Sequence, residues 1–542
     1  MRPELTVATS EPYDDLLSTL VTDRVASRLA AQDATLWGPK AEPDASIRLS
    51  WVGLPRSSRS LLTELDALRA QLWSEDIDRV VLCGMGGSSL APEVISRSYG
   101  VPLEILDSTN PSVVSRALSG DLARTVVVVS SKSGGTVETD SQRRAFEAAF
   151  LAAGIDAASR FVVVTDPGSD LERLATEAGY RKVFTADPDV GGRYSALTAF
   201  GLVPSALAGV DVADLLDEAE DEMDRLARDS PDNVALLLAA AIVGNPGRDK
   251  LVIADAGSGI VGFGDWAEQL IAESTGKQGL GVLPVAVEGV DAPEISREAP
   301  DVVVALLTGE DTAGADTTKE DAPGVDVGAK PVVSVSGTLG AQFLLWETAT
   351  AIAGRIIGIN PFDQPDVESA KKAARGLLDE QPETDHATLT EAGIEVRGSQ
   401  GLLDNVDSLS TAVDNLLAKL GDDGYLAVMA YLDSQRDSTL AALRATLSRR
   451  TNRPVTFGWG PRFLHSTGQY HKGGPGQGVF LQITCDETRD IDIPERAFGF
   501  GTLIAAQAAG DAKVLADHDR PVLRLHLLEP ESGVDALQRL LA

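Results

Sequence analysis

Short apolar runs, each ended by glycine, serine, aspartate or proline, recur along much of this sequence. The first series comprises "RVVLCGMGG", "LEILDSTNP", "RTVVVVSSKSGG", "RFVVVTDPGS" and "RKVFTADP", with stretches long enough for helices between them. Strands that are apolar without alternation are covered on both faces, and strands that alternate with helices form parallel sheets. The pattern therefore predicts an α/β fold, with a first doubly wound parallel sheet at about 76–205.

A second series of runs predicts a second doubly wound parallel sheet at about 206–380, with "DKLVIADAGSG", "LGVLPVAV", "DVVVALLTG" and "KPVVSVSG" as strands. Helical spacing before the first sheet predicts a helical segment at 1–75. After the polar linker "DEQPETDHATLTEAG", further apolar runs predict an additional α/β region at 395–542. A chain of 542 residues is expected to divide into several domains. We assign no function to the acidic loop near 309–330.

The charge balance limits the partners of this chain. The sequence has 47 Lys and Arg against 81 Asp and Glu, a net charge of −34. Such a field repels nucleic acid phosphates and anionic lipids, so we expect neither nucleic acid nor membrane partners. The two cysteines lie far apart, the first residues have no apolar signal-peptide core, and no apolar run is long enough to span a membrane. We therefore expect a cytoplasmic protein.

The stretch "VVVVSSKSGGTVET" predicts an anion-binding loop between a strand and a helix. Ser131, Ser133 and Thr136 supply hydroxyl groups around Gly134 and Gly135, where backbone N–H groups at a helix N-terminus can also face a phosphate. The alternative is that Ser131 or Ser133 merely caps the helix. Capping needs one hydroxyl, however, and this loop has three.

A second glycine-rich turn, "GMGGSSL", follows the first strand of the same sheet. It differs from the dinucleotide fingerprint GxGxxG because Ser89 stands at the last glycine position, and the nucleotide phosphate loop GxxxxGK is absent from the sequence. Taken alone, such a turn is more often a plain connection. Two such loops at the carboxyl ends of parallel strands, however, lie where open α/β sheets bind ligands.

Five motifs in order resemble the sugar isomerase domains of the glucose-6-phosphate isomerase family. They are the two loops above and "GGRYSALTAFG", "WAEQLIAESTGK" and "GINPFDQPDVESAKK". The stretches "DATLWGP" and "FLHSTGQYHKGGPGQGVFLQI" are similar to the isomerase half of fusions between transaldolase and this family. We expect no transaldolase barrel, because 75 residues before the first strand cannot hold eight strands.

The resemblance implies a substrate-binding set. It comprises Ser131, Lys132 through its backbone, Ser133 and Thr136 on the phosphate, and Gly87 and Ser88 along the sugar. It also implies that Arg193 lies beside the reacting carbons, that Glu273 is the base, and that Gln364 and Lys371 close the site. Singly, Arg193 could form a salt bridge, and Glu273 and Lys371 could be solvated surface charges.

The reaction of the family requires these residue types. Moving a carbonyl between C1 and C2 requires a carboxylate that removes a carbon proton and returns it to the next carbon, through a cis-enediol(ate). An arginine can stabilise the enediolate charge without losing its own proton. We expect no metal and no cofactor.

The histidine that opens the sugar ring in the family lies between the glutamate and lysine motifs, but no histidine lies between Glu273 and Lys371. Two later histidines are candidates. His471 follows a Gly-Gln pair, as the family histidine does, and we prefer it, whereas His465 precedes "STG" and is the alternative.

The resemblance implies an enzyme that interconverts glucose 6-phosphate and fructose 6-phosphate, and it suggests a homodimer. Two alternatives stay open: an isomerase of wider specificity that includes mannose 6-phosphate, and a noncatalytic sugar-phosphate sensor. A sensor would have no use for Arg193, Glu273 and Lys371 together. The sequence leaves open which subunit supplies the histidine.

Overall fold

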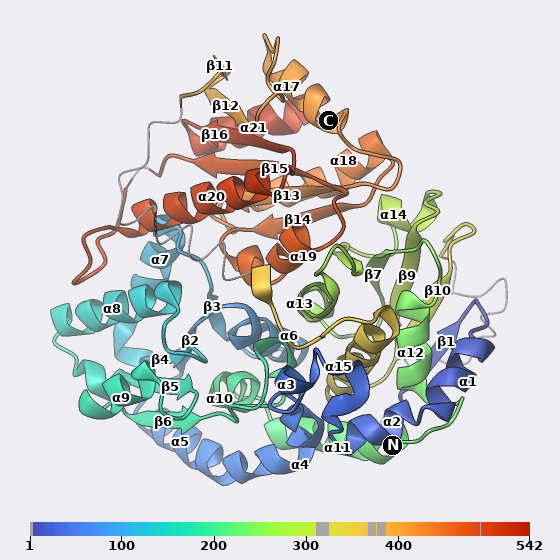
Figure 1. Cartoon of the computed structure of the whole chain (residues 1–542). Helices are drawn as coiled ribbons and strands as arrows, with labels where there is room; N and C mark the ends of the chain where they lie inside the picture. The colour runs from blue at the N-terminus through green and yellow to red at the C-terminus, as the bar shows by residue number, and fades with distance from the viewer. Residues whose placement is uncertain (1–3, 310–324, 367–375, 377–385, 488, 542) are drawn as a thin grey trace.

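The computed structural model describes residues 4–309, 325–366, 376, 386–487 and 489–541. The described residues form three β-sheets with helices packed on them (Figure 1). In that view the first sheet lies at the lower left in cyan, the second at the right in green and yellow, and the third at the top in orange and red. The α/β class predicted from the sequence is confirmed.

The first sheet is parallel throughout, with strand order β3-β2-β4-β5-β6. Its strands are β2 (Arg79–Gly84), β3 (Glu104–Leu106), β4 (Thr125–Ser130), β5 (Phe161–Thr165) and β6 (Lys182–Thr185). Its helices are α6 (Leu90–Ser98), α7 (Pro111–Leu118), α8 (Val137–Ala152), α9 (Asp170–Glu177) and α10 (Ala199–Ala208). Every residue of β4 is buried, as expected for a strand covered on both faces.

The second sheet has strand order β1-β10-β9-β7-β8. Its parallel strands are β7 (Lys250–Ala256), β8 (Leu283–Ala286), β9 (Val302–Thr308) and β10 (Val332–Ser336). Its helices are α11 (Val212–Leu226), α12 (Val234–Val243), α13 (Phe263–Thr275), α14 (Pro293–Ser296) and α15 (Leu339–Ile357).

The N-terminal segment differs from the expectation in one respect. It contains β1 (Thr6–Thr9), which pairs antiparallel with β10 at the edge of the second sheet. Four residues are too few for a periodic signal, and pairing covers an edge that would otherwise expose backbone groups. The rest of the segment is helical as predicted, with α1 (Asp14–Thr22), α2 (Val25–Ala30), α3 (Glu42–Ala45), α4 (Leu54–Ser57) and α5 (Leu62–Ser74).

The C-terminal region forms the third sheet, with strand order β11-β12-β16-β15-β13-β14. β13 (Tyr425–Tyr431), β14 (Val455–Trp459), β15 (Gly478–Cys485) and β16 (Val522–Leu527) are parallel, whereas β11 (Leu389–Glu391) and β12 (Ile394–Gly398) are antiparallel. Its helices are α17 (Leu409–Leu417), α18 (Leu443–Thr451), α19 (Gly468–Gly473), α20 (Phe500–Asp517) and α21 (Pro530–Leu541). We propose that each sheet with its helices is one structural unit.

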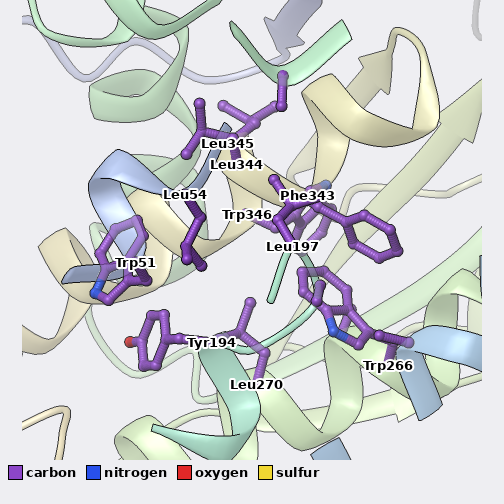
Figure 2. Packing of buried hydrophobic residues seen from close by; sticks show 14 of the residues in the cluster. Trp51, Leu54, Tyr194, Leu197, Trp266, Leu270, Phe343, Leu344, Leu345 and Trp346 are labelled. Carbon is purple, nitrogen blue, oxygen red and sulfur yellow. The ribbon is translucent and has the colours of Figure 1, made fainter. Parts of the chain in front are cut away.

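Aromatic side chains join the N-terminal segment to the first two sheets. Trp51 stacks on Tyr194 with ring centroids 5.0 Å apart, and Trp266 packs edge-on against Phe343 at 4.7 Å (Figure 2). Trp346 lies in the same cluster and is fully buried. Truncating one such aromatic to alanine costs roughly 3–5 kcal/mol, so this cluster contributes strongly to holding these segments together.

A separate apolar cluster joins the second and third sheets. It combines side chains from β7, β8 and β9 with side chains from β13, β15 and α20, among them Val252, Val304, Met429 and Phe480. The third region is therefore packed on the second sheet and is held in a defined position beside it. None of the helices in the described ranges is long and apolar enough to cross a membrane. Residues 310–324 of the acidic loop lie outside the described residues.

Candidate active site

The loop between β4 and α8 brings together the three hydroxyl groups singled out in the sequence. Ser131 Oγ donates a hydrogen bond to Thr136 Oγ1 at 3.0 Å, and the Gly135 N–H donates to Ser133 Oγ at 3.3 Å. Gly134 has a φ of 73°, and a Cβ there would lie 2.7 Å from the backbone nitrogen of Leu171. The loop therefore requires glycine at this position.

Thr136 stands at the N-cap position of α8, but its side chain accepts no capping hydrogen bond among the described residues. The Lys132 ammonium lies 2.7 Å from Asp166 Oδ2 and donates to the Pro188 carbonyl at 3.1 Å. The side chain of Lys132 is thus engaged outside the loop.

The glycine turn after β2 approaches the segment that carries Arg193. This turn forms a 3₁₀ helix, η4 (Gly86–Ser88), beside a second one, η7 (Gly192–Tyr194). A Cβ on Gly87 would lie 2.0 Å from the Gly192 carbonyl oxygen, so only glycine permits this approach. The Ser195 hydroxyl also donates to the Gly87 carbonyl, at 3.3 Å.

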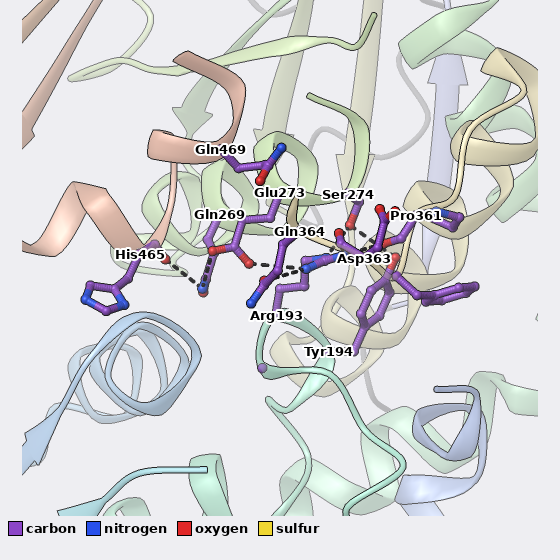
Figure 3. A network of polar contacts seen from close by, with 12 residues as sticks. Arg193, Tyr194, Gln269, Glu273, Ser274, Pro361, Asp363, Gln364, His465 and Gln469 are labelled. Atoms are coloured by element: carbon purple, nitrogen blue, oxygen red, sulfur yellow. Dashed lines mark hydrogen bonds and ion pairs between the residues drawn. The ribbon is translucent and has the colours of Figure 1, made fainter. Parts of the chain in front are cut away.

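Arg193 is 3% exposed and is held by hydrogen bonds from all three of its guanidinium nitrogens (Figure 3). Nε donates to Ser274 Oγ at 2.9 Å, and Nη1 donates to Gln364 Oε1 at 3.0 Å. Nη2 donates to the carbonyl oxygens of Pro361 at 2.6 Å and Asp363 at 3.0 Å. A buried positive charge with its orientation set in this way is suited to stabilising a developing oxyanion.

Glu273 lies beside Arg193 on α13 and is 4% exposed. Its Oε2 is 3.4 Å from Arg193 Nη1, and its Oε1 is 3.4 Å from Gln269 Nε2. Both distances are at the long end for hydrogen bonds, so these two contacts hold the carboxylate weakly. A buried carboxylate beside a fixed guanidinium is a suitable arrangement for moving a carbon proton.

His465 ends a one-turn 3₁₀ helix, η10 (Arg462–His465), in the third region. Its carbonyl accepts from Gln269 Nε2 at 2.8 Å, while its ring points the other way in Figure 3. The ring Nε2 lies 3.2 Å from Glu138 Oε1, on the first turn of α8. Gln507 Nε2 also donates to Glu138 Oε1, at 2.7 Å.

The structure does not bring His471, the histidine preferred from the sequence, to this site. Its ring packs among Tyr425, Phe463 and Phe480, and neither ring nitrogen has a hydrogen-bond partner in the part of the chain described. Burial, and then the nearby positive charge of Lys472, lower the pKa of His471 well below its usual value, so the ring is neutral. Of these two histidines, His465 is the one that contacts the site.

Known proteins are similar to this chain in sequence. The model of the family described as "Phosphoglucose isomerase" matches residues 66–277. A glucose-6-phosphate isomerase from a Synechococcus strain is 32% identical over 354 residues, which cover 54% of this chain and 65% of the relative. The corresponding protein of Gloeothece citriformis is 30% identical over 367 residues, covering 58% of this chain and 69% of the relative.

The chain belongs to the phosphoglucose isomerase family. A crystal structure of a glucose-6-phosphate isomerase from Chlamydia trachomatis shares the fold, with a TM-score of 0.56 at 20% identity over 70% of this chain and 90% of that one. This chain spans 65% of the length of the Synechococcus relative, slightly less than two thirds.

The phosphoglucose isomerase match ends at Lys277, so it includes both loops, Arg193 and Glu273 but not the third region. His465 therefore comes from a part of the chain outside the matched stretch. Lys371, expected to close the site, lies outside the described residues. Gln364, also expected to close the site, accepts a hydrogen bond from Arg193 Nη1 at 3.0 Å.

Sequence reasoning missed several polar residues at this site. Gln269 could have been found, because it lies four residues before Glu273 and so shares its helix face. Lys277 donates to the carbonyl oxygens of Asn360 and Asp363 at 2.9 and 2.6 Å and steadies the segment that carries Gln364. Burial, followed by the charge of Arg193, lowers the pKa of Lys277 to about 8.

Gln469 is a third polar residue at this site that sequence reasoning missed. Its amide donates to the Gly276 carbonyl at 2.9 Å and to Asp366 Oδ2 at 2.7 Å, and its oxygen accepts from the Asp366 N–H at 3.0 Å. Nothing in the sequence signals contacts between segments this far apart. Within the described ranges, no group of three His, Cys, Asp or Glu side chains is arranged to hold a metal ion.

Proposed function

We propose that this protein interconverts glucose 6-phosphate and fructose 6-phosphate through a cis-enediol(ate). The observation that carries the proposal is the buried Glu273 carboxylate beside the fixed Arg193 guanidinium, in a chain of the phosphoglucose isomerase family. The contact between the two side chains also argues against a noncatalytic sensor, which needs no base beside the reacting carbons.

In the proposed reaction, Glu273 removes the proton from C2 of the open-chain aldose, and the electron pair of that C–H bond forms the C1–C2 double bond. The aldehyde oxygen becomes the enediolate oxygen, whose charge Arg193 stabilises. Glu273 then returns the proton to C1 while the proton of the C2 hydroxyl passes to the charged oxygen on C1, so that C2 becomes the ketone and C1 carries a hydroxyl group. The reaction consumes no oxidant or reductant, because the proton and the electron pair only move to the neighbouring carbon.

We assign phosphate binding to Ser131, Ser133, Thr136 and the backbone at Lys132, and contact with the sugar to Gly87 and Ser88. A chain with a net charge of −34 repels a free sugar phosphate, so it needs donors concentrated at one point. The hydroxyl groups and the N-terminus of α8 supply them.

We assign ring opening to His465 rather than His471. The support is the contact of the His465 ring with Glu138, since a carboxylate partner orients an imidazole. Such a histidine can give a proton to the ring oxygen and take one from the hydroxyl on the anomeric carbon.

The test is incubation of the purified protein with fructose 6-phosphate, in buffer without added metal or cofactor, while glucose 6-phosphate is measured. We expect steady formation of glucose 6-phosphate to equilibrium. Tight binding of fructose 6-phosphate without turnover would instead support the sensor. Incubation with mannose 6-phosphate in the same assay tests the wider specificity, which would yield fructose 6-phosphate from both aldoses.

We also propose the homodimer that the family resemblance suggests. Within the described residues, one chain already combines the phosphate loop, Arg193, Glu273 and His465. We therefore expect specific activity to stay constant when the dimer is diluted into monomers. A loss of activity that follows dissociation would mean that the partner chain completes the site.

A further inference from the structure

One arginine lies where the third region meets the elements that carry the candidate site. Arg462 is the first residue of η10, the helical turn that ends at His465. Its Nη2 donates to Glu93 Oε2 at 2.5 Å, and its Nη1 lies 3.0 Å from Asp107 Oδ2. A third carboxylate, Asp265, lies 3.8 Å from Nη2.

These three carboxylates belong to elements that position the substrate loop and the base. Glu93 is in the first turn of α6, directly after the glycine turn that contains Gly87. Asp107 follows the last residue of β3. Asp265 is in the first turn of α13, the helix that carries Gln269 and Glu273. A single guanidinium therefore connects the turn that carries His465 both to α6, which follows the Gly87 turn, and to α13, which carries Glu273.

The charge arrangement makes this arginine difficult to replace. The Arg462 side chain is 21% exposed and that of Asp107 is 14% exposed, so solvent screens the pair only partly. Burial raises the pKa of Asp107 and the charge of Glu93 raises it further, whereas Arg462 opposes both effects. Without the guanidinium, Glu93 and Asp107 would face each other with like charges. A lysine would restore the charge, but it lacks the two Nη atoms with which the arginine reaches two carboxylates at once.

Contacts with other elements hold the turn in part, since Phe463 is buried and the His465 carbonyl accepts from Gln269 Nε2 at 2.8 Å. Its backbone is held by the Leu464 N–H donating to the Pro461 carbonyl at 3.0 Å and the Ser466 N–H donating to the Phe463 carbonyl at 3.0 Å. The adjacent glycine turn also limits movement, because a Cβ on Gly86 would lie 2.8 Å from the His465 carbonyl oxygen. Small movements of η10 would therefore change where the His465 ring lies relative to Glu138 and the substrate.

We propose that Arg462 is a positioning residue for ring opening, which acts by fixing η10, and with it the His465 ring, against the α6 and α13 side of the site. The proposal rests on the proposed function and on the role assigned there to His465. Arg462 touches no reacting atom in this scheme, so its effect should be confined to substrates that must first open a ring.

The test compares a cyclic with an open-chain substrate. Fructose 6-phosphate needs ring opening, whereas erythrose 4-phosphate cannot cyclise because its C4 oxygen carries the phosphate. For Arg462→Met we expect turnover of fructose 6-phosphate to fall roughly 10- to 100-fold, as for a small misplacement of a catalytic group. Isomerisation of erythrose 4-phosphate should change less than about threefold. The exchange rate between glucose 6-phosphate anomers, followed by NMR, should fall in parallel with the turnover of fructose 6-phosphate.

Arg97→Met is the matched control, because Arg97 binds the other oxygen of Glu93, at 3.3 Å, and is half exposed. We expect it to retain activity on both substrates. Arg462→Lys provides a second test if the methionine variant does not fold. It should show the same selective loss to a smaller degree. In a His465→Ala background, Arg462→Met should cost no further activity on fructose 6-phosphate.

Equal losses on both substrates, or losses that multiply in the double variant, would overturn the positioning role. Unchanged activity of Arg462→Met and Arg462→Lys on fructose 6-phosphate would do the same while leaving the proposed function intact. A wild-type protein inactive on both substrates would instead remove the proposed function, and this inference with it.

Discussion

At the scale of single residues, two glutamates of α13 lie in different surroundings. On α13, Glu273 lies against Arg193, whereas Glu268 has its pKa raised well above the usual range by burial, and further by the nearby charge of Asp265. Two glutamates on one helix thus lie in different electrostatic surroundings.

Glu273→Gln should lower kcat by roughly 10²- to 10⁴-fold, with little change in substrate binding, because an amide cannot accept a carbon proton. Steady-state kinetics with fructose 6-phosphate and equilibrium binding measure the two effects. Wild-type reactions in deuterated water should also place deuterium at C2 of glucose 6-phosphate. The matched control is Glu268→Gln, which makes the same substitution elsewhere on α13 and should stay active. Equal turnover by Glu273→Gln and wild type would remove Glu273 from this role.

The buried ring of His471 should make the wild-type protein sensitive to acid. Its pKa lies well below the ordinary 6.5, so below that pH the unfolded chain binds a proton that the folded chain does not. The free energy of unfolding should therefore fall as pH drops below 6.5, because the unfolded state is the one stabilised by protonation.

His471→Leu should remove that part of the acid sensitivity and leave stability at neutral pH within about 1 kcal/mol, since no hydrogen bond to the ring is lost. Isomerase activity should be retained. Denaturant unfolding between pH 5 and 7.5 measures the first effect, and His465→Ala, which should lose turnover of cyclic substrate, is the comparison for the second. An inactive, well-folded His471→Leu protein would return the ring-opening role to His471.

At the scale of elements, the site is assembled by close backbone approach between loops. The glycine turn after β2 meets η7 at Gly87 and meets η10 at Gly86, so segments of the first sheet and the third region converge there. Glycine is needed at these positions because a Cβ would occupy the space of a neighbouring carbonyl oxygen.

Gly87→Ala should therefore separate η4 from η7 and shift Arg193, with a loss in kcat/KM of roughly 100-fold. The chain should still fold, which circular dichroism and thermal unfolding can verify. Gly191→Ala is the matched control in the neighbouring loop, because its φ is −69° and a Cβ there would meet only Tyr194 Cδ2 at 3.9 Å. Similar kinetics for the two variants would contradict the role assigned to this contact.

At the scale of the whole molecule, buried ion pairs fix the third region to the second sheet. Asp301, just before β9, lies 2.9 Å from the Lys250 ammonium and also pairs with Arg453 of the third region. Arg453 Nε donates to the Gly424 carbonyl at 2.8 Å as well. The pairs are almost fully removed from solvent, so each charge depends on its partners.

Arg453→Met should lower the free energy of unfolding by roughly 3–5 kcal/mol, because it leaves a buried carboxylate with one cation instead of two. Arg450→Met is the control, since Arg450 pairs with Asp414 at the surface and should change stability by less than about 1 kcal/mol. Urea unfolding of both variants makes the comparison. A negligible effect of Arg453→Met would mean that the apolar cluster alone holds the third region.

The sequence alone determined the features that depend on residues close together in the chain. Continuous apolar runs indicated the parallel strands, since covered strands need no polar face, and the hydroxyl-rich turn after β4 indicated the loop for which anion binding stays a prediction. The resemblance implied that Arg193 lies beside the reacting carbons and that Glu273 is the base. The direct contact between these residues, which are 80 apart in the chain, comes from the structure.

Tertiary structure alone decided which histidine lies at the site. His465 and His471 are six residues apart in a motif that favoured His471, yet packing buries one ring among aromatics and brings the other to Glu138. Contacts such as Arg462 with Glu93 and Asp107 likewise join segments more than 350 residues apart. No periodic or local signal encodes such contacts, because they depend on how whole sheets pack against one another.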